Sequence, residues 1–452
     1  MAFFLPFSGH ALTSQTTANQ IQGTPPYLTF DGGRTRAVDV NGLLGITLSD
    51  GTQYTPLTNT SSDSRPIVLP VAGQSFADIS MFVPTDTNSV ALSSLIGPPN
   101  NYWGDDDGDS GVTATGRLSL SIVDKNNRPV SRDTVLTTCT DSAPYRVTLS
   151  STDGTLSTRY GFPNRSTFSA RNVTYYVNPK AAVCFARPNL KNGKLGDDIS
   201  TTWDFAGPAS MWDPANGFIP QSNGPSSYGL NFPTTGANGL YFDLLIGGVN
   251  QPLSWSPVSL GGITATMSNP TATSVRVTLT GPYATPSQIS SANPGPLSTI
   301  SLPQTFELVG RDNNGNPVIK YGFTLKQWFV NRGSKTEMYP QTLSWCNSLG
   351  YRLPRARDLS NASCRNSNPD YVCHGSVGAL PSSPDDHYMR HIGSGFFTEW
   401  GRMYDYSGVG FYSDWYWTSD PYDGRRQFVV DTFAGSIDRY DNTIYYVLCA
   451  YP

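Results

Sequence analysis

The stretch LSWCNSLGYRLPRARDL, residues 343–359, has the pattern of a helix in a chain that has few other helix signals. Four apolar residues in it recur at helix-like spacing: Leu343, Trp345, Cys346 and Leu349. Gly350 follows as a natural helix end, and Pro354 suits the first position of a second short helix that would run to Leu359. The stretch therefore predicts two short helices near the end of the chain.

The composition around this stretch favours strands and turns. Charged residues make up only 14% of the 452 residues, while Gly (43) and Pro (35) are abundant and aromatic residues reach 12%. Many short strands joined by Gly, Pro and Asn turns have this composition, because aromatic side chains pack well on pleated surfaces. The length suggests two or three domains, and the composition predicts a mainly β fold.

Alternating apolar residues define several of the strands. In residues 117–136, Leu118, Leu120 and Ile122 alternate with polar residues up to an Asn-Asn turn. Residues 305–323 repeat this scheme, and the Asp-Gly pair in residues 144–161 predicts a hairpin. Such spacing is typical of β-sandwiches. We expect residues 26–315 to form one sandwich or two, with a division near 195–225, after a linker or domain edge at 1–25.

Several classes of function find no support in the sequence. The formal net charge of −4 offers no basic field for nucleic acid. No run of about 18 apolar residues encodes a membrane span. The catalytic signatures G-x-S-x-G and H-E-x-x-H and the phosphate loop are missing, which predicts a protein that is not an enzyme. Paired carboxylates occur throughout, so a carbohydrate-active enzyme or a glycan-binding module remains the alternative.

The chain has six cysteines, at positions 139, 184, 346, 364, 373 and 449. Their number is even, their spacing is wide, and no C-x-x-C motif occurs among them. Three disulfides suit this distribution better than a metal site does, which indicates an oxidising compartment.

The segment WGDDDGDSG, residues 103–111, is the candidate metal site. It spaces Asp105, Asp107 and Asp109 two residues apart in a Gly-rich turn, so that alternate carboxylates can converge on a hard cation such as calcium. The Gly and Glu that an EF-hand loop requires are replaced by Ser110 and Gly116. The simpler interpretation is a solvated acidic loop between strands.

Two resemblances cover nearly the whole chain. The helix with its cysteine, followed by GYRLP (350–354), long loops, YWTSD (416–420) and VLC (447–449), resembles the C-type-lectin-like domain that ends intimin and invasin-type bacterial adhesins. Upstream, segments 105–124, 231–244 and 321–333 resemble the β-rich adhesion domain of enterobacterial inverse autotransporters. The resemblance implies an Ig-like β-sandwich region followed by an α+β C-type-lectin-like domain at 316–452.

The resemblance also implies disulfide pairs. In the lectin-like fold a cysteine of the first helix pairs with one of the last strand, which implies Cys346 with Cys449. Closing a loop of about 100 residues stabilises by up to roughly 4–5 kcal/mol. Cys364 would then pair with Cys373, and Cys139 with Cys184.

The function implied by the resemblance is that of a non-catalytic adhesin on the bacterial cell surface. Such a protein is exported through the periplasm and binds a host surface protein or a glycan. The strings SNPD (367–370) and SDWYW (413–417) do not reproduce the calcium-binding motifs of sugar-binding lectins. The resemblance therefore does not extend to calcium-dependent sugar binding.

The stretch FFTEWGRMYDYSGVGFYSDWYW, residues 396–417, is the best candidate for a binding surface, within the long loops at 365–415. Rigid aromatic side chains amid Gly, Ser and Asp are typical of binding loops. Trp417 is expected in a core strand instead. The predicted binding residues are Glu399, Tyr404, Asp405, Tyr406, Tyr412, Asp414 and Trp415.

Overall fold

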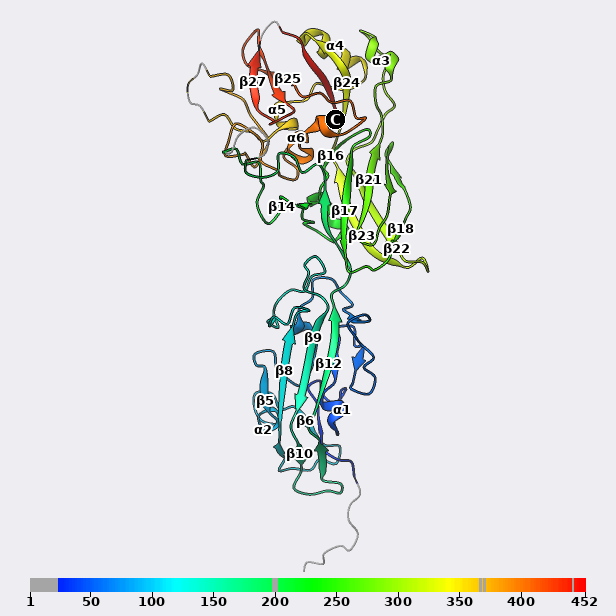
Figure 1. The fold of residues 1–452 in the computed structure, drawn as a ribbon, viewed down its shortest axis with the longest axis vertical. Helices are drawn as coiled ribbons and strands as arrows, with labels where there is room; N and C mark the ends of the chain where they lie inside the picture. Colours follow the sequence, from blue (N-terminus) through cyan, green and yellow to red (C-terminus); the bar gives the residue numbers. More distant parts are fainter. Residues whose placement is uncertain (1–22, 197–201, 366–367, 369–370, 441–442) are drawn as a thin grey trace, which may run out of the picture. The chain divides into compact units, whose positions relative to one another are not determined.

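The computed structural model describes residues 23–196, 202–365, 368, 371–440 and 443–452. The chain divides into two compact units, Met1–Lys180 and Ala181–Pro452. Residues 1–22, most of the predicted linker, lie outside the described residues. The fold is mainly β, as the composition predicted, and Figure 1 labels many of its strands and helices.

The main sheet of unit 1 has five strands in the order β4-β12-β9-β8-β5. Its central strands pair antiparallel: β8 (Arg117–Val123), β9 (Tyr145–Ser151) and β12 (Arg171–Asn178). The edges are β4 (Ile67–Val68), which is parallel to β12, and β5 (Ser89–Ala91), which is antiparallel to β8. Leu118, Leu120 and Ile122 of β8 are buried, which confirms the predicted alternation.

A second sheet of unit 1 has the order β11-β10-β7, with β7 (Thr113–Thr115), β10 (Gly154–Ser157) and β11 (Arg165–Phe168). The hairpin predicted at Asp153-Gly154 does not form, because β9 and β10 belong to different sheets. At this crossing Gly154 lies so close to β7 that a Cβ would be 2.3 Å from the Thr115 carbonyl oxygen. The remaining elements are β1 (Tyr27–Leu28), α1 (Val40–Leu43), β2 (Ile46–Thr47), β3 (Gln53–Tyr54), η1 (Phe76–Asp78), α2 (Leu92–Leu95) and β6 (Trp103–Gly104).

Unit 2 begins with a β-sandwich. One sheet has seven strands in the order β14-β15-β13-β17-β21-β20-β19, and the other has three, β18-β22-β23. The two faces meet at Phe242 of β17 and Phe323 of β23, whose ring centroids lie 6.0 Å apart. The strands of the larger sheet are β13 (Ala182–Arg187), β14 (Trp212–Asp213), β15 (Gly217–Phe218), β17 (Tyr241–Gly247), β19 (Val258–Leu260), β20 (Ile263–Ser268) and β21 (Ser274–Thr280). The smaller sheet has β18 (Ser254–Trp255), β22 (Gln304–Arg311) and β23 (Pro317–Leu325), and η2 (Pro225–Leu230) and α3 (Pro286–Ser290) lie in the connections.

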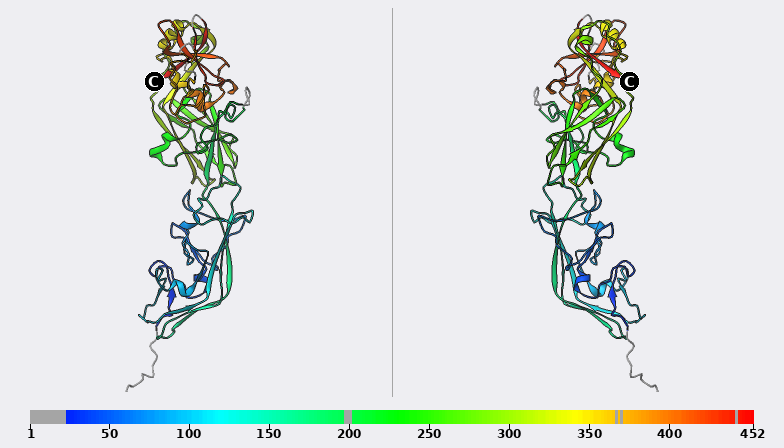
Figure 2. Two further views of the ribbon diagram at one scale, coloured as in Figure 1. Left: turned by 90° about the vertical axis from the view of Figure 1, so that its left-hand side faces the viewer. Right: turned by 90° about the vertical axis from the view of Figure 1, so that its right-hand side faces the viewer.

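The terminal part of unit 2 is a six-stranded sheet in the order β16-β24-β28-β25-β26-β27. Figure 2 shows its orange and red strands at one end of the green sandwich strands of the same unit. The strands are β16 (Thr235–Ala237), β24 (Gln327–Glu337), β25 (Trp415–Pro421), β26 (Gln427–Asp431), β27 (Ile437–Tyr440) and β28 (Tyr445–Tyr451). The helices are α4 (Tyr339–Ser348), α5 (Ala356–Leu359), α6 (Phe396–Trp400) and η3 (Met403–Asp405).

The predicted helices and two predicted disulfides are confirmed. Helix α4 begins four residues before the quoted stretch and overlaps it, α5 lies within it, and Trp417 is buried in β25, as predicted. Cys346 of α4 is bonded to Cys449 of β28 with a Cα–Cα distance of 5.4 Å, and both are fully buried. Cys364 is bonded to Cys373. The pairing of Cys139 with Cys184 stays a prediction.

The domain limits differ from those expected at residues 315 and 195–225. The hairpin of β22 and β23 pairs from Gln304 with Leu325 to Arg311 with Pro317, so the sandwich continues past residue 315. Strand β16 is parallel to β24 and belongs to the terminal sheet although it precedes most sandwich strands in sequence. The compact units divide after Lys180. None of the helices in the described part of the chain has the length and apolar character needed to cross a membrane.

Candidate functional site

Glu399, predicted as a polar partner on the binding surface, is fully buried in α6. Its Oε1 accepts hydrogen bonds from the Thr234 hydroxyl (2.8 Å) and the Gly393 amide (2.8 Å). Its Oε2 accepts from the Thr235 amide (3.0 Å) and hydroxyl (2.5 Å), and the Thr234 amide lies 3.1 Å from both oxygens. Burial raises the pKa of Glu399, and these donors oppose that rise. The carboxylate holds α6 against the start of β16, so it is not a surface group.

Tyr406 is also buried, which corrects its predicted place on the binding surface. Its hydroxyl donates to the Trp400 carbonyl oxygen (3.0 Å) and accepts from the Asn189 amide (2.8 Å). Its ring contacts Tyr241 and Trp400 edge-on. Desolvation by burial raises the pKa of the Tyr406 phenol. The residue connects the terminal loops to the sandwich of unit 2.

Two other predicted residues, Tyr412 and Asp414, lie near Tyr446, which the prediction missed. Tyr412 is 43% exposed, and its ring stacks on Tyr446 with a centroid distance of 5.2 Å and an interplanar angle of 9°. Asp414 is exposed and accepts from the Trp415 amide (2.8 Å), while Trp415 is half-buried at the start of β25. We call Tyr412, Asp414 and Tyr446 the Tyr412 surface.

The backbone under the Tyr412 surface is well fixed. The Tyr412 amide donates to the hydroxyl of buried Tyr416 (3.0 Å), and the Thr432 hydroxyl donates to the Tyr412 carbonyl oxygen (2.8 Å). The Tyr416 ring lies 5.4 Å from that of Tyr446 and so supports the stack from below. A rigid aromatic side chain on a fixed backbone loses little entropy on binding, which makes it a suitable contact residue.

Tyr404 and Asp405 have a different set of neighbours. The Tyr404 ring stacks on Phe433 with a centroid distance of 6.4 Å, and the Arg402 guanidinium lies over both rings, 4.7 and 4.9 Å from their centroids. Asp405 is exposed and accepts from the Asn189 side-chain amide (3.3 Å). Both residues remain candidates for binding, in surroundings that are more strongly tied to the rest of unit 2.

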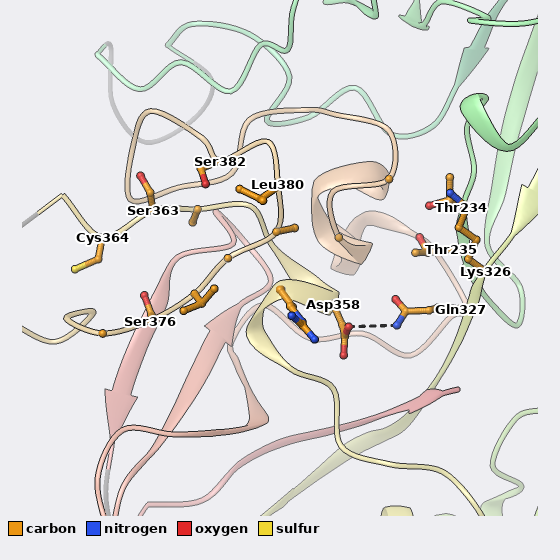
Figure 3. A pocket seen from close by; sticks show the side chains of 18 of the residues that line it. Thr234, Thr235, Lys326, Gln327, Asp358, Ser363, Cys364, Ser376, Leu380 and Ser382 are labelled. Carbon is orange, nitrogen blue, oxygen red and sulfur yellow. Dashed lines mark hydrogen bonds between the residues drawn. The ribbon is translucent and has the colours of Figure 1, made fainter.

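A cavity of about 1040 Å³ lies beside α5, the first residues of β24 and the loop at 362–382 (Figure 3). The sequence prediction missed it, since its walls come from distant, mostly small residues. They are Thr234, Thr235, Lys326, Gln327, Arg357, Asp358, Ala362, Ser363, Cys364, Arg365, His374, Gly375, Ser376, Val377, Gly378, Ala379, Leu380, Ser382, Gly393, Gly395 and Pro452. Its volume is in the range of pockets that bind ligands.

The acidic loop of unit 1 brings its three predicted carboxylates together. Asp105, Asp107 and Asp109 each place an oxygen within 4.8 Å of the others, as the spacing predicted. Burial and the charges of the other two carboxylates raise the pKa of Asp109. Asp106 points elsewhere and pairs with Arg36 at 2.6 Å. The arrangement offers the oxygen ligands that calcium prefers, and binding of calcium stays a prediction.

We expect calcium to raise the melting temperature of unit 1 in protein first stripped of metal. The reason is mass action, since an ion that binds only the folded state stabilises it by about 2.7 kcal/mol at a hundredfold excess over the dissociation constant. Differential scanning calorimetry in calcium and in chelator measures the shift. The matched variant Asp107→Asn should show a smaller shift. Identical curves for the native protein in the two buffers would support the solvated loop.

Comparison with known proteins finds similarity to bacterial adhesins. No family model matches the chain. It is 30% identical over 140 residues to the inverse autotransporter adhesin YeeJ of Escherichia coli strain K12, which covers 29% of this chain and 5% of that protein. The chain thus spans a small fraction of this relative. The match confirms the resemblance to inverse autotransporter adhesins.

Two solved structures are similar to this chain at lower sequence identity. Invasin, a bacterial integrin-binding protein, matches with 13% identity and a TM-score of 0.36, over 78% of this chain and 53% of invasin. The C-terminal 282-residue fragment of intimin, solved in complex with the intimin-binding domain of the translocated intimin receptor, matches with 11% identity and a TM-score of 0.30. That match covers 76% of this chain and 100% of the fragment.

Proposed function

We propose that this chain is a region of an intimin/invasin-type adhesin that stands on the bacterial cell surface and attaches to a host cell or matrix. The sequence match to an inverse autotransporter adhesin carries the proposal. The protein would reach the surface by export through the periplasm, which suits the buried Cys346–Cys449 disulfide, because disulfides form in oxidising compartments. Its partner would be a host surface protein or glycan.

The Tyr412 surface supports a place for this contact in the terminal part of unit 2. It combines exposed aromatic area with an exposed carboxylate on a fixed backbone. Aromatic residues in such settings dominate the binding energy of many protein interfaces. Recognition by this surface is the finer part of the proposal and is tested separately from the adhesin class.

The composition of the large cavity favours a non-catalytic role. Hydrolysis of a glycosidic bond needs two carboxyl groups that flank it. Among the described residues that line the cavity, Asp358 has the one side-chain carboxylate. Arg352 at 2.7 Å and Gln327 at 3.2 Å already hold that group. Glu399 approaches the same region but is enclosed by its five donors. The proposed function is therefore binding.

The variant Tyr412→Ala is expected to weaken attachment by about 1–3 kcal/mol of binding free energy, because it removes the exposed ring of the stack. The melting temperature should change little, since the side chain is 43% exposed. Flow cytometry of epithelial cells incubated with the labelled chain measures attachment. Pre-treatment of the cells with protease or with glycosidase separates a protein receptor from a glycan.

Tyr283→Ala is the matched control for this variant, because Tyr283 lies in the same unit, is 56% exposed and is outside the Tyr412 surface. It should attach as the native chain does. Equal attachment by the Tyr412→Ala and native chains would place recognition elsewhere. Failure of the native chain to attach to any of several epithelial and matrix preparations would argue against the adhesin proposal itself.

A further inference from the structure

The large cavity in unit 2 carries an excess of unpaired positive charge. Lys326 and Arg357 line it, are exposed, and make no ion pair or hydrogen bond through their side chains with any described residue. Two other charged lining groups are neutralised: Arg365 pairs with Asp385 at 2.6 Å, and Asp358 pairs with Arg352 at 2.7 Å. Asp420 interacts electrostatically with Arg357 without forming an ion pair, so the positive charge of the pair is only partly balanced. Two such cations at a concave site favour an anionic ligand.

One wall of the cavity offers unused backbone groups. The segment 375–380 is irregular. Its Ser376 amide donates to the Cys373 carbonyl oxygen (3.0 Å) and its Ala379 amide to the Ser360 carbonyl oxygen (2.8 Å), whereas the amides of Gly375, Val377 and Gly378 have no acceptor within the described structure. Gly378 packs so closely on the neighbouring chain that a Cβ would lie 2.4 Å from the Ala362 carbonyl oxygen. The hydroxyl of Ser376 is buried and has no partner among the described residues. These free donors and acceptors suit another extended backbone.

The side chains at the rim distinguish a peptide from a sugar. Val377 is 67% exposed and Leu380 is 79% exposed, and both line the cavity. Its described lining contains no Phe, Tyr or Trp ring, and the His374 imidazole is its one aromatic group, whereas the flat faces of sugars pack on large aromatic rings. Exposed aliphatic side chains beside a concave polar surface are typical of a protein interaction site. The rim thus matches aliphatic side chains of a polypeptide.

We propose that this cavity binds an extended peptide segment in which acidic and aliphatic residues alternate. Successive side chains of an extended strand point to opposite sides, so the acidic set can face Lys326 and Arg357 while the aliphatic set covers Val377 and Leu380. The backbone of the segment pairs with the free groups of 375–378. The proposal adds a second site to the Tyr412 surface and does not depend on it.

The test uses the full chain and the acetylated, amidated pentapeptide Val-Glu-Leu-Glu-Val, with the Val-Gln-Leu-Gln-Val peptide as its uncharged counterpart. Titration followed by amide NMR of deuterated protein should shift the resonances of Gly375, Val377 and Gly378. The Gln peptide should bind at least about tenfold more weakly, because charge-assisted hydrogen bonds are lost. Added salt should also weaken the binding of the acidic peptide, because salt screens the attraction between charges.

The double variant K326Q/R357Q should bind the acidic peptide at least about tenfold more weakly, as expected for loss of two charged contacts. Its matched control is K335Q/R425Q, which removes one exposed lysine and one exposed arginine outside the cavity and should bind as the native chain does. Equal affinity for the two peptides, or native affinity in K326Q/R357Q, would overturn the proposal. Tighter binding of sialyllactose at the same amides would replace it with an acidic glycan.

The two proposals fail in different ways. If Tyr412→Ala abolishes attachment to cells but leaves the peptide titration unchanged, the Tyr412 surface and the cavity are separate sites and both proposals stand. If the native chain attaches to cells while no amide of 375–378 responds to the acidic peptide, the cavity proposal is wrong and the adhesin proposal remains.

Discussion

Simultaneous replacement of Cys346 and Cys449 by alanine is expected to lower the free energy of unfolding of unit 2 by about 4–5 kcal/mol. The disulfide closes a loop with a sequence separation of 103 and so removes much of the freedom of the unfolded chain. It joins α4 to β28, near the middle of the six-stranded sheet. Urea unfolding followed by tryptophan fluorescence measures the loss, because several of the tryptophans, including Trp345 and Trp417, are buried in this unit.

The second disulfide of unit 2 supplies the control. Cys364 and Cys373 are nine residues apart, so their loop-closure contribution is smaller, at about 2–3 kcal/mol. Their replacement by alanine should therefore cost less than replacement of Cys346 and Cys449. An equal or larger cost for the short loop would show that strain or packing, and not chain entropy, sets the stability of this unit.

Replacement of Glu399 by alanine is expected to lower the free energy of unfolding of unit 2 by about 3–5 kcal/mol. The amides of Thr234, Thr235 and Gly393 donate to this carboxylate within the core. After truncation the amides of Thr234 and Thr235 would remain buried without an acceptor, and each such group costs about 1–3 kcal/mol. The Gly393 amide is exposed and can bind water instead. Urea unfolding of the native and variant chains measures the difference.

The variant Glu399→Gln separates two contributions of the Glu399 side chain, the hydrogen bonds that it accepts and the volume that it fills. The amide keeps the size of the side chain and one acceptor oxygen, but its NH2 group faces donors where the native chain has an oxygen. The two threonine hydroxyls can rotate to accept from it, whereas the backbone amides cannot. We therefore expect Glu399→Gln to lower the free energy of unfolding of unit 2, but by less than Glu399→Ala does. A loss below about 1 kcal/mol in Glu399→Ala would mean that water or other groups satisfy the donors.

Local patterns in the sequence were sufficient to predict the elements whose formation depends on residues close together in the sequence. The spacing of Leu343, Trp345 and Cys346 predicted α4, and the alternation in 117–123 predicted β8. The spacing of Asp105, Asp107 and Asp109 predicted their convergence, because a tight turn decides it locally. The resemblance to lectin-like domains supplied the pairing of Cys346 with Cys449, which no local pattern contains.

Burial in the loops at 396–417 could not be predicted in the same way. The sequence shows Glu399 and Tyr406 among Gly, Asp and Tyr, which is typical of an exposed loop. The partners of Glu399 are 165 and 164 residues away, at Thr234 and Thr235, and the partner of Tyr406 is 217 residues away, at Asn189. Only the packing of the whole unit reveals that Glu399 is surrounded by hydrogen-bond donors. The cavity was missed for the same reason.

The way in which β16 joins the terminal sheet has a consequence for the inheritance of this region. Residues 234–237 contribute the strand beside β24 and the two threonines whose hydroxyls donate to Glu399. The terminal sheet is therefore encoded in two separated pieces of the gene. A recombination junction near codon 316 would transfer the loops at 365–415 but leave behind that strand and the threonines that bind Glu399. Exchange between bacterial lineages should therefore favour junctions near codon 181, and chimeric adhesins built for vaccines or targeting should be joined there as well.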